Sequence, residues 1–337
     1  MKRVPKFAVL TLSAMLALSG CGMTSDPLPG TIGEDGQPAA VSTQDYVPAE
    51  VVKPKDGKKV KIGASFPLLD QFLQNVANSI KERAEAAGAE VSITSAEEKI
   101  EIQLNQIENF IASGVDALIV LPQDTATTAQ ITQKAKAANI PLVYVNRRPS
   151  ELPKGVPYVG SDSLVAGQLE MEQLAKLSNH QGNVAILQGD PTQEAAQQRT
   201  QGCKEVAAKY NMNVVFDQTG LWMRDKGLAL AENLIQSGQQ VDVICANNDE
   251  MALGAINAFE NAGMLDKVVV GGVDATGDAL NAMAAGKLEV TVFQDAKGQG
   301  QAGVDTAIKM VNGDEVPDII NVPYQLVTPE NMSQFQQ

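Results

Sequence analysis

Histidine, cysteine and positive charge are all scarce in this chain of 337 residues. A single histidine, His180, leaves no multi-histidine metal site and no Glu-x-x-His pair. Three cysteines are too few for a fold that depends on many disulfides. The net charge of −14 argues against a nucleic-acid-binding protein, because such proteins need basic side chains to neutralise phosphates.

Aromatic residues make up only 4% of the chain, and Trp222 is the only tryptophan. Hydrophobic residues nevertheless reach 44%, which is enough to build large cores and excludes a disordered chain. Beyond the N-terminal region, no segment approaches the roughly 20 apolar residues that a membrane-spanning helix needs. The length allows two domains of ordinary size.

The first 20 residues read as a signal peptide, with a basic start followed by an apolar run and small residues. Residues 18–21, Leu-Ser-Gly-Cys, resemble the lipobox of bacterial lipoproteins. That resemblance implies cleavage before Cys21 and lipidation of its thiol, and therefore a membrane anchor. The alternative is ordinary secretion with an incidental cysteine. Residues 21–58 contain five prolines and no apolar periodicity, which predicts a flexible tether.

From residue 60 onward, short β-branched runs alternate with stretches of helical periodicity. Near-continuous apolar runs are typical of strands buried on both faces of a parallel sheet, so the pattern predicts an α/β fold. The rhythm is interrupted near residues 156–161, where we place a boundary between two lobes. The predicted strands cover residues 60–64, 91–94, 117–121, 142–145, 184–187, 214–216, 241–245, 268–272, 290–293 and 322–327.

Polar and aromatic residues follow these strands repeatedly. Open parallel sheets bind ligands at the carboxyl ends of their strands, so these residues are candidates for one site. They include Asp70, the pair Asn146-Arg147, Trp222, the run Asn247–Glu250 and Asp274.

With these residues the chain resembles the type I periplasmic sugar-binding proteins, over about residues 60–330. The most specific match is residues 246–255, Ala-Asn-Asn-Asp-Glu-Met-Ala-Leu-Gly-Ala, and residues 199–202 and 273–274 match in order and spacing. The resemblance implies two Rossmann-like lobes with parallel sheets flanked by helices, joined by three hinge crossings near Ser161, Asp295 and Val322. The expected lobes are residues 59–161 plus 295–320 and residues 162–294 plus 321–337.

The resemblance also implies a monosaccharide-sized ligand between the lobes. Its implied contacts are Asp70, Phe72, Asn146, Arg147, Arg199, Trp222, Asn248, Asp274 and Gln294. Hydroxyl groups both donate and accept hydrogen bonds, as carboxylate, amide and guanidinium partners require, and an aromatic ring covers apolar C–H faces. Two aspartates against two arginines favour a neutral ligand.

The sequence departs from the family's galactose type in two ways that bear on the choice of metal and ligand. The calcium loop of the galactose type is not recognisable near residues 179–183, so no metal is expected. Gln193 and Ala195 stand where the galactose type has histidine and aspartate, and Asn146-Arg147 differs from both the galactose and ribose types. An inositol-like cyclitol therefore becomes a candidate.

Each residue also has a simpler interpretation. Asp70 or Asn146 could cap a helix, Arg199 could be solvated, Trp222 could be a packing residue, and Asp249 reads mainly as an N-cap. Cys203 and Cys245 read as buried free thiols. Gly298–Gly303 matches the dinucleotide motif G-x-G-x-x-G, but no acidic residue ends the next strand to bind a ribose.

The sequence thus predicts an extracytoplasmic, lipid-anchored substrate-binding protein of an ABC importer. It would be a monomer without cofactor or enzymatic activity, with a neutral sugar or cyclitol and a permease as partners. The same domain could instead present its ligand to a chemoreceptor or kinase. A LacI-type regulator is disfavoured by the signal segment and the absence of a helix-turn-helix. A third alternative is an enzyme that uses Asp70 and Asp274 as an acid/base pair for glycoside hydrolysis, which product formation from a glycoside would reveal.

Overall fold

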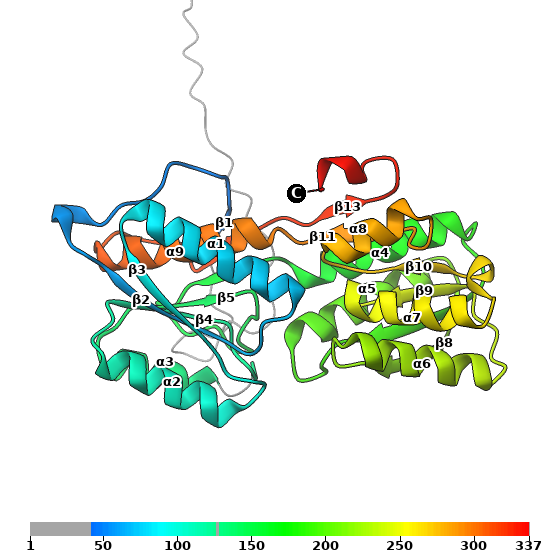
Figure 1. Ribbon diagram of the computed structural model, residues 1–337, viewed down its shortest axis with the longest axis horizontal. Coiled ribbons are helices and arrows are strands. Elements are labelled where there is room, and N and C mark those ends of the chain that lie inside the picture. Colours follow the sequence, from blue (N-terminus) through cyan, green and yellow to red (C-terminus); the bar gives the residue numbers. More distant parts are fainter. Residues whose placement is uncertain (1–41, 126–127, 337) are drawn as a thin grey trace, which may run out of the picture.

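The computed structural model describes residues 42–125 and 128–336, which form two lobes built on separate parallel sheets (Figure 1). Among these residues, seven strands form the first sheet in the order β1-β12-β6-β5-β4-β2-β3, with every pair parallel. Their bounds are β1 Thr43–Asp45, β2 Lys61–Phe66, β3 Glu90–Ser95, β4 Ala117–Val120, β5 Leu142–Val145, β6 Tyr158–Gly160 and β12 Ile319–Asn321.

The second sheet has the order β10-β9-β7-β8 and is also parallel. Its strands are β7 Asn183–Gln188, β8 Asn213–Thr219, β9 Val243–Ala246 and β10 Val269–Gly271. Two isolated bridges, Gly271 with Val290 and Asp274 with Phe293, connect the end of β10 and the loop after it to the segment around β11 Thr291–Phe293. Strand β11 pairs antiparallel with β13 Gln325–Val327. The polar ends of β9 and β10 therefore face the hinge side of this lobe.

Helices cover both faces of each sheet, as near-continuous apolar strands require. On the first sheet, α1 Gln71–Ala87 and α9 Ala296–Val311 pack on one face, and α2 Ile100–Ala112 and α3 Thr128–Ala137 on the other. On the second, α4 Ser163–Leu177 and α5 Glu194–Lys209 pack on one face. Its opposite face carries α6 Arg224–Gln236, α7 Asp249–Asn261 and α8 Gly277–Ala284. The predicted α/β fold is confirmed.

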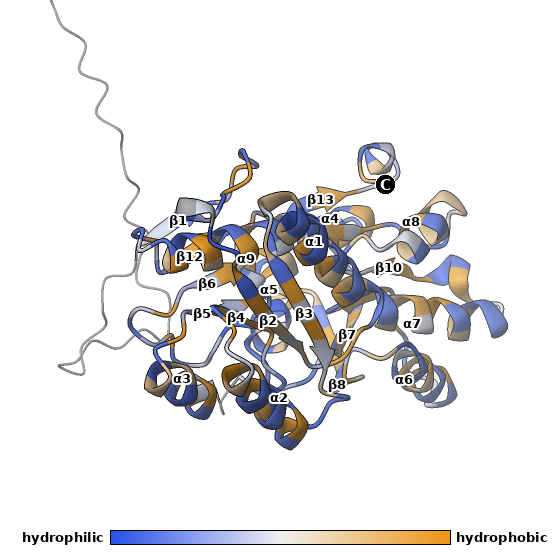
Figure 2. Cartoon of the chain, turned by 60° about the vertical axis from the view of Figure 1, so that its left-hand side comes forward, coloured by the Kyte–Doolittle hydropathy of each residue, from blue (hydrophilic) through white to orange (hydrophobic). Residues whose placement is uncertain are grey.

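The hydropathy pattern explains this layering. All four residues of β4 and of β5 are buried, so these strands can only lie between two helical layers. Figure 2 shows that outer helices such as α2 and α3 carry both hydrophilic and hydrophobic residues, as expected for helices with one face on a sheet. No helix within the described residues is long and apolar enough to cross a bilayer.

The glycines of the G-x-G-x-x-G motif lie inside α9 and serve helix packing. A Cβ atom at Gly300 would lie 2.7 Å from Cβ of Ser79 on α1, and one at Gly303 would lie 3.0 Å from Val145. The Ser79 hydroxyl donates to the carbonyl of Lys297 at 2.8 Å. These small residues therefore let α9 approach α1 and β5 closely.

The chain passes between the two lobes three times: between β6 and α4, between β11 and α9, and between β12 and β13. The last passage differs from expectation, because one strand is predicted over residues 322–327. The structure instead has β12 in the first lobe and β13 against β11. Pro323 separates them and lacks the N–H that a continuous ladder needs.

The prediction of a flexible tether is also wrong for the second part of that segment. Residues 42–54, here called the N-terminal strap, lie along the first lobe: β1 pairs with β12, and the Tyr46 hydroxyl donates to Gln301 on α9 at 2.9 Å. Arg83 on α1 donates to the carbonyls of Ala49 and Glu50 at 3.1 and 3.0 Å. The signal peptide, Cys21 and the rest of the predicted tether, up to residue 41, lie outside the described residues.

The interpretation of Cys203 and Cys245 as free thiols is wrong. The structure joins them in a disulfide between α5 and β9, with 6.7 Å between the two Cα atoms. Helix α5 packs over the second sheet and brings Cys203 onto the buried face of Cys245. With Cys21 set apart as the lipidation site, the remaining two cysteines form a pair, which was the signal available in the sequence.

Candidate functional site

A small cavity of about 50 Å³ lies between the two lobes and gathers all nine residues that the sequence predicts as ligand contacts. We call it the interlobe cavity. The first lobe contributes Asp70, Phe72, Asn146 and Arg147, and the second lobe and the hinge contribute the others. Its further lining residues are Leu73, Ser163, Gln193, Ala195 and Tyr324. The parallel sheets explain the convergence, because most of these residues follow the carboxyl end of a strand.

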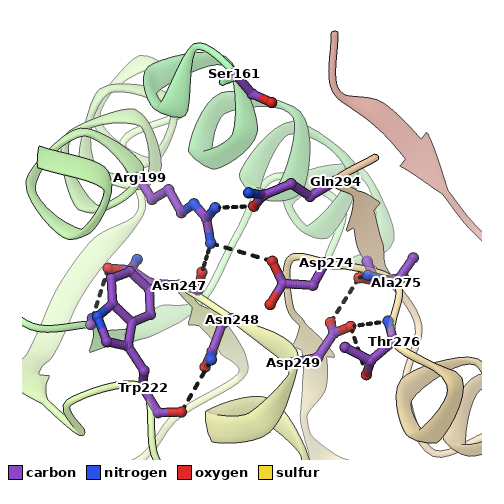
Figure 3. Close-up of polar contacts among 12 residues, drawn as sticks. Ser161, Arg199, Trp222, Asn247, Asn248, Asp249, Asp274, Ala275, Thr276 and Gln294 are labelled. Carbon is purple, nitrogen blue, oxygen red and sulfur yellow. Dashed lines mark hydrogen bonds and ion pairs between the residues drawn. The ribbon is translucent and has the colours of Figure 1, made fainter. Parts of the chain in front are cut away.

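Arg199 is the centre of the hydrogen-bond network (Figure 3). It lies on α5, is 4% exposed, and donates to the carbonyl of Asn247 at 2.6 Å and to the hydroxyl of Tyr324 at 2.8 Å. It also donates to the side-chain oxygen of Gln294, and its guanidinium lies 5.6 Å from the centre of the Trp222 ring. A buried, multiply bonded guanidinium is not a solvated helix residue, so the simpler interpretation of Arg199 is wrong.

Asp274 faces this arginine at 3.7 Å and is itself 9% exposed. Burial raises the pKa of its carboxyl well above the usual range, although Arg199 opposes the shift. Its carboxylate accepts no hydrogen bond from the rest of the described chain, and its backbone is held at φ 122°. This leaves two acceptor oxygens at the cavity and a backbone conformation that L-residues rarely adopt.

Asp70 combines two roles. One carboxylate oxygen caps α1 by accepting from the backbone N–H of Leu73 at 2.7 Å. Burial raises the pKa of this carboxyl, while the charge of Arg147 lowers it. The carboxyl of Asp70 also lines the interlobe cavity, so capping and a binding role are compatible at this position.

Asn146 and Arg147 follow β5. Asn146 adopts φ 64° and donates its amide N–H to Gln299 on α9 at 3.0 Å, so it is not a helix cap. Arg147 is buried, and burial lowers its pKa to about 10, so that it still carries a charge near neutral pH. Its contacts with the carbonyls of Pro122 and Gln123 are long, 3.4 and 3.5 Å, which leaves N–H groups for another acceptor.

Trp222 is held by its edge and by its backbone. Its indole N–H donates to Gln193 at 3.1 Å, and its carbonyl accepts from the amide of Asn248 at 3.1 Å. A Cβ atom at Gly189 would lie only 2.1 Å from the indole, so glycine is needed there for close approach. The ring is thus fixed in one orientation beside the cavity.

In the run Asn248-Asp249 the helix cap is Asn248 and not Asp249, which the sequence predicts as the cap. Asn248 is the N-cap of α7 and accepts from the backbone of Met251 at 3.0 Å. Asp249 is fully buried and accepts from the backbone of Thr276 at 2.8 Å and from the hydroxyl of Thr291 at 2.7 Å. Burial raises its pKa to about 7. The interpretation of Asp249 as a cap is therefore wrong, and this residue ties α7 to the loop that holds Asp274.

Two residues of this network are not among the nine predicted contacts: Asn247, which the sequence places only in a candidate run, and Tyr324. Asn247 was visible in the matched run 246–255 but precedes the cap position. Tyr324 lies after the third hinge crossing, where no strand end or motif marks it, and its hydroxyl donates to Gln294 at 3.2 Å. The sequence marks Gln193 only as a departure from the galactose type. In the structure its side-chain oxygen accepts a hydrogen bond from the indole N–H of Trp222.

A larger groove of about 470 Å³ adjoins the interlobe cavity and shares Phe72, Asp274 and Gln294 with it. Its other walls come mainly from α1 and α8. The interlobe cavity is the stronger candidate site, because the charged side chains of both lobes converge there.

Two lobes, three crossings and a polar cavity between them define a solute-binding protein of the periplasmic type. A family model described as a periplasmic binding protein domain matches residues 62–315. A candidate rhizopine-binding protein of Rhizobium meliloti is 41% identical over 284 residues, 82% of this chain and 92% of the relative. The ribose import binding protein of Bacillus subtilis is 30% identical over 285 residues, covering 83% and 92%.

A solved structure agrees with these sequence matches. The ABC transporter solute-binding protein from Bacillus halodurans C-125, with bound myo-inositol, is 42% identical. It superposes with a TM-score of 0.80 over 84% of this chain and 99% of the other. The chain therefore belongs to the periplasmic binding protein type I sugar-binding family, a family of binding proteins and not of enzymes.

Proposed function

We propose that the interlobe cavity binds a neutral cyclitol or monosaccharide, with myo-inositol as the first candidate and ribose or a hexose as the others. The observation that carries this proposal is the set of unused hydrogen-bonding groups at the cavity. Asp274 and Asp70 bring carboxyl oxygens to the cavity, and Arg147 and the amide nitrogen of Gln294 bring N–H donors. A polyol ring, which carries hydroxyls on every side, suits such an alternation.

The charges favour an uncharged ligand. In the ionised form Asp70 and Asp274 balance Arg147 and Arg199 within one small cavity, and in the protonated form, which burial favours, each carboxyl can still donate to or accept from a neutral hydroxyl. A carboxylate on the ligand, about 4 Å from one of these aspartates, would meet repulsion of about 4 kcal/mol at an effective dielectric constant near 20. Neutral hydroxyl groups meet no such penalty and gain charge-assisted hydrogen bonds from both kinds of side chain.

The choice of myo-inositol draws support from the Bacillus halodurans relative, whose structure holds that ligand. The Bacillus subtilis relative is a ribose import binding protein, so a pentose stays in the panel. The two matches cover 83% and 84% of this chain.

The proposed setting is the outer face of a cell membrane. Lipidation at Cys21 would anchor the chain, and the closed form, a monomer, would deliver its ligand to the permease of an ABC importer. Presentation to a chemoreceptor or kinase is the alternative, which an uptake assay in a deletion strain separates from transport. The Cys203–Cys245 disulfide supports this setting, because disulfides persist in oxidising compartments outside the cytosol.

The binding proposal is tested by calorimetric titration of the purified chain with myo-inositol, ribose, glucose, galactose and an anionic sugar acid. We expect saturable heat with one or more of the neutral polyols and none with the acid. Absence of binding to every neutral polyol would overturn the proposal. Lipidation is tested by metabolic labelling with palmitate, which should mark the full chain and not its Cys21→Ser variant.

A further inference from the structure

The disulfide joins the two elements that hold the central arginine in place. Cys203 lies on α5 one helical turn after Arg199, and Cys245 lies on β9 two residues before Asn247. Arg199 donates to the carbonyl of Asn247 at 2.6 Å. The covalent bond and this hydrogen bond therefore connect the same helix to the same strand, about one helical turn apart.

A buried carboxyl on α4, the other helix on this face of the sheet, secures the same strand. Glu170 on α4 is fully buried, and one of its oxygens accepts from the backbone N–H of Ala246 at 2.9 Å. Its second oxygen has no hydrogen-bond partner within the described residues. A carboxylate oxygen of Glu170 and the two cysteine sulfurs all lie within 4.8 Å of one another. Ala246 is the residue between Cys245 and Asn247, so this bond fixes the strand where it delivers Asn247.

Helices α4 and α5 are themselves in close contact beneath the cavity. A Cβ atom at Gly167 would lie 2.0 Å from the carbonyl oxygen of Arg199, and one at Gly202 would lie 2.6 Å from the carbonyl oxygen of Leu164. The backbone at Arg199 can therefore not move toward α4. With the disulfide in place, it cannot move away from β9 either.

We propose that Cys203, Cys245 and Glu170 form a brace that sets the position of the Arg199 guanidinium, so that ligand affinity depends on the intact disulfide. These are positioning residues, since none of them lines the cavity. The inference rests on the proposed function. Burial raises the pKa of Glu170 well above the usual range, which is consistent with a neutral carboxyl beneath the cavity. Reducing the bond adds two electrons and two protons and leaves two thiols.

The test compares the oxidised chain with two forms that lack the bond: the Cys203→Ala/Cys245→Ala variant, and the wild type refolded in dithiothreitol, which is oxidised to its cyclic disulfide. Affinity for myo-inositol, or for whichever polyol of the panel binds, is measured by calorimetry below the melting transition. We expect both forms to bind at least fivefold more weakly. Trp222 emission should also change without ligand, because its ring lies against Arg199.

A control separates positioning from stability. Leu234→Ala removes a buried side chain on α6, on the opposite face of the second sheet from the disulfide. Compared at the same distance from its own melting temperature, it should bind as the wild type does. Glu170→Gln keeps an acceptor for Ala246 and should bind normally, whereas Glu170→Leu should lose affinity as the cysteine variants do.

Each outcome has one meaning. Unchanged affinity together with unchanged Trp222 emission in the forms without the disulfide would overturn the brace. A loss of affinity in Leu234→Ala equal to that in the forms without the disulfide would also overturn it. If the oxidised wild type binds no polyol, the proposed function fails. The brace is then judged on Trp222 emission alone, where an unshifted spectrum in both forms without the bond rejects it.

Discussion

At the scale of the residue, Arg199 is bonded on several sides to the protein and also lines the cavity that we propose as the ligand site. Its guanidinium bonds to a carbonyl, an amide and a tyrosine hydroxyl that come from different segments of the chain. Burial makes these bonds costly to lose, because unpaired polar groups in the interior carry the full desolvation penalty. The planar fork of arginine matches this arrangement, whereas the single ammonium group of lysine does not.

We therefore expect Arg199→Lys to weaken ligand binding by about 3 kcal/mol, roughly 100-fold, since hydrogen bonds to charged groups contribute about 1.5–3 kcal/mol each. Calorimetric titration measures the loss. Arg224→Lys is the matched control, because Arg224 pairs with Glu250 and Asp278 and does not line the cavity. A change of less than threefold in Arg199→Lys would contradict the assignment.

Trp222 supports a second prediction at this scale. Trp222→Ala should weaken binding by roughly 1–3 kcal/mol, the scale of a buried aromatic contact. Saturating ligand should also change the emission of this only tryptophan in the wild type. Trp222→Phe keeps a ring but loses the bond to Gln193, so it should fall between the two. Wild-type affinity in Trp222→Ala would move the ring to a purely packing role.

At the scale of the element, the N-terminal strap is held by a buried ion pair. Arg83 on α1 and Asp305 on α9 lie 2.6 Å apart with side chains 8% and 9% exposed. Arg83 also donates to the carbonyls of Ala49 and Glu50, so the same guanidinium joins two helices and the strap. Removing one partner of such a pair leaves an uncompensated buried charge.

Arg83→Met should accordingly lower the free energy of unfolding by about 3–5 kcal/mol. Urea denaturation of the purified full chain measures this loss of stability. The exposed pair of Lys134 and Glu108 provides the control, since Lys134→Met should change stability by less than about 1 kcal/mol. Equal effects of the two substitutions would refute a structural role for the buried pair.

The elements that sequence reasoning predicted well are those whose local pattern has a single explanation. The strands β4 and β5 are continuous apolar runs, and the site residues that follow strands inherit their position from them. The strap, the split of the last strand and the disulfide were not predictable in this way. Residues 42–54 bind through β1 and through backbone carbonyls that accept from Arg83, which no side-chain pattern reveals. Tyr324 and the Cys203–Cys245 pair depend on contacts between distant segments.

At the scale of the whole molecule, several buried acids share one electrostatic consequence. Burial raises the pKa of Asp249 to about 7 and that of Glu194 to about 6, and it raises the pKa of Asp274 in the same direction. In the unfolded chain these carboxyls titrate near their ordinary pKa of about 4. Between about pH 4 and pH 7 the folded chain therefore binds more protons than the unfolded chain.

Stability should consequently fall as the pH rises through this window, because the free energy of unfolding decreases where the folded state holds the extra protons. We expect a higher melting temperature at pH 5.5 than at pH 7.5 in calorimetry without ligand. Carboxyls whose pKa is lowered, such as Asp278 and Glu172, titrate below this range and do not offset the trend. In Asp249→Asn the difference between the two pH values should shrink. A higher melting temperature at pH 7.5 would contradict the prediction.

The N-terminal strap also gives the two lobes unequal mechanical roles. All of its described contacts are with the first lobe, through β12, α1 and α9, and its last ladder bond joins Tyr46 to Asn321, just before the third crossing. If the chain is attached to a surface through its N-terminus, as we propose, the first lobe would be the fixed part and the second lobe would move relative to it. A pull on that attachment would then run along the parallel strands β1 and β12 and load their hydrogen bonds together in shear, so that the proposed closing motion of the second lobe would not carry this load.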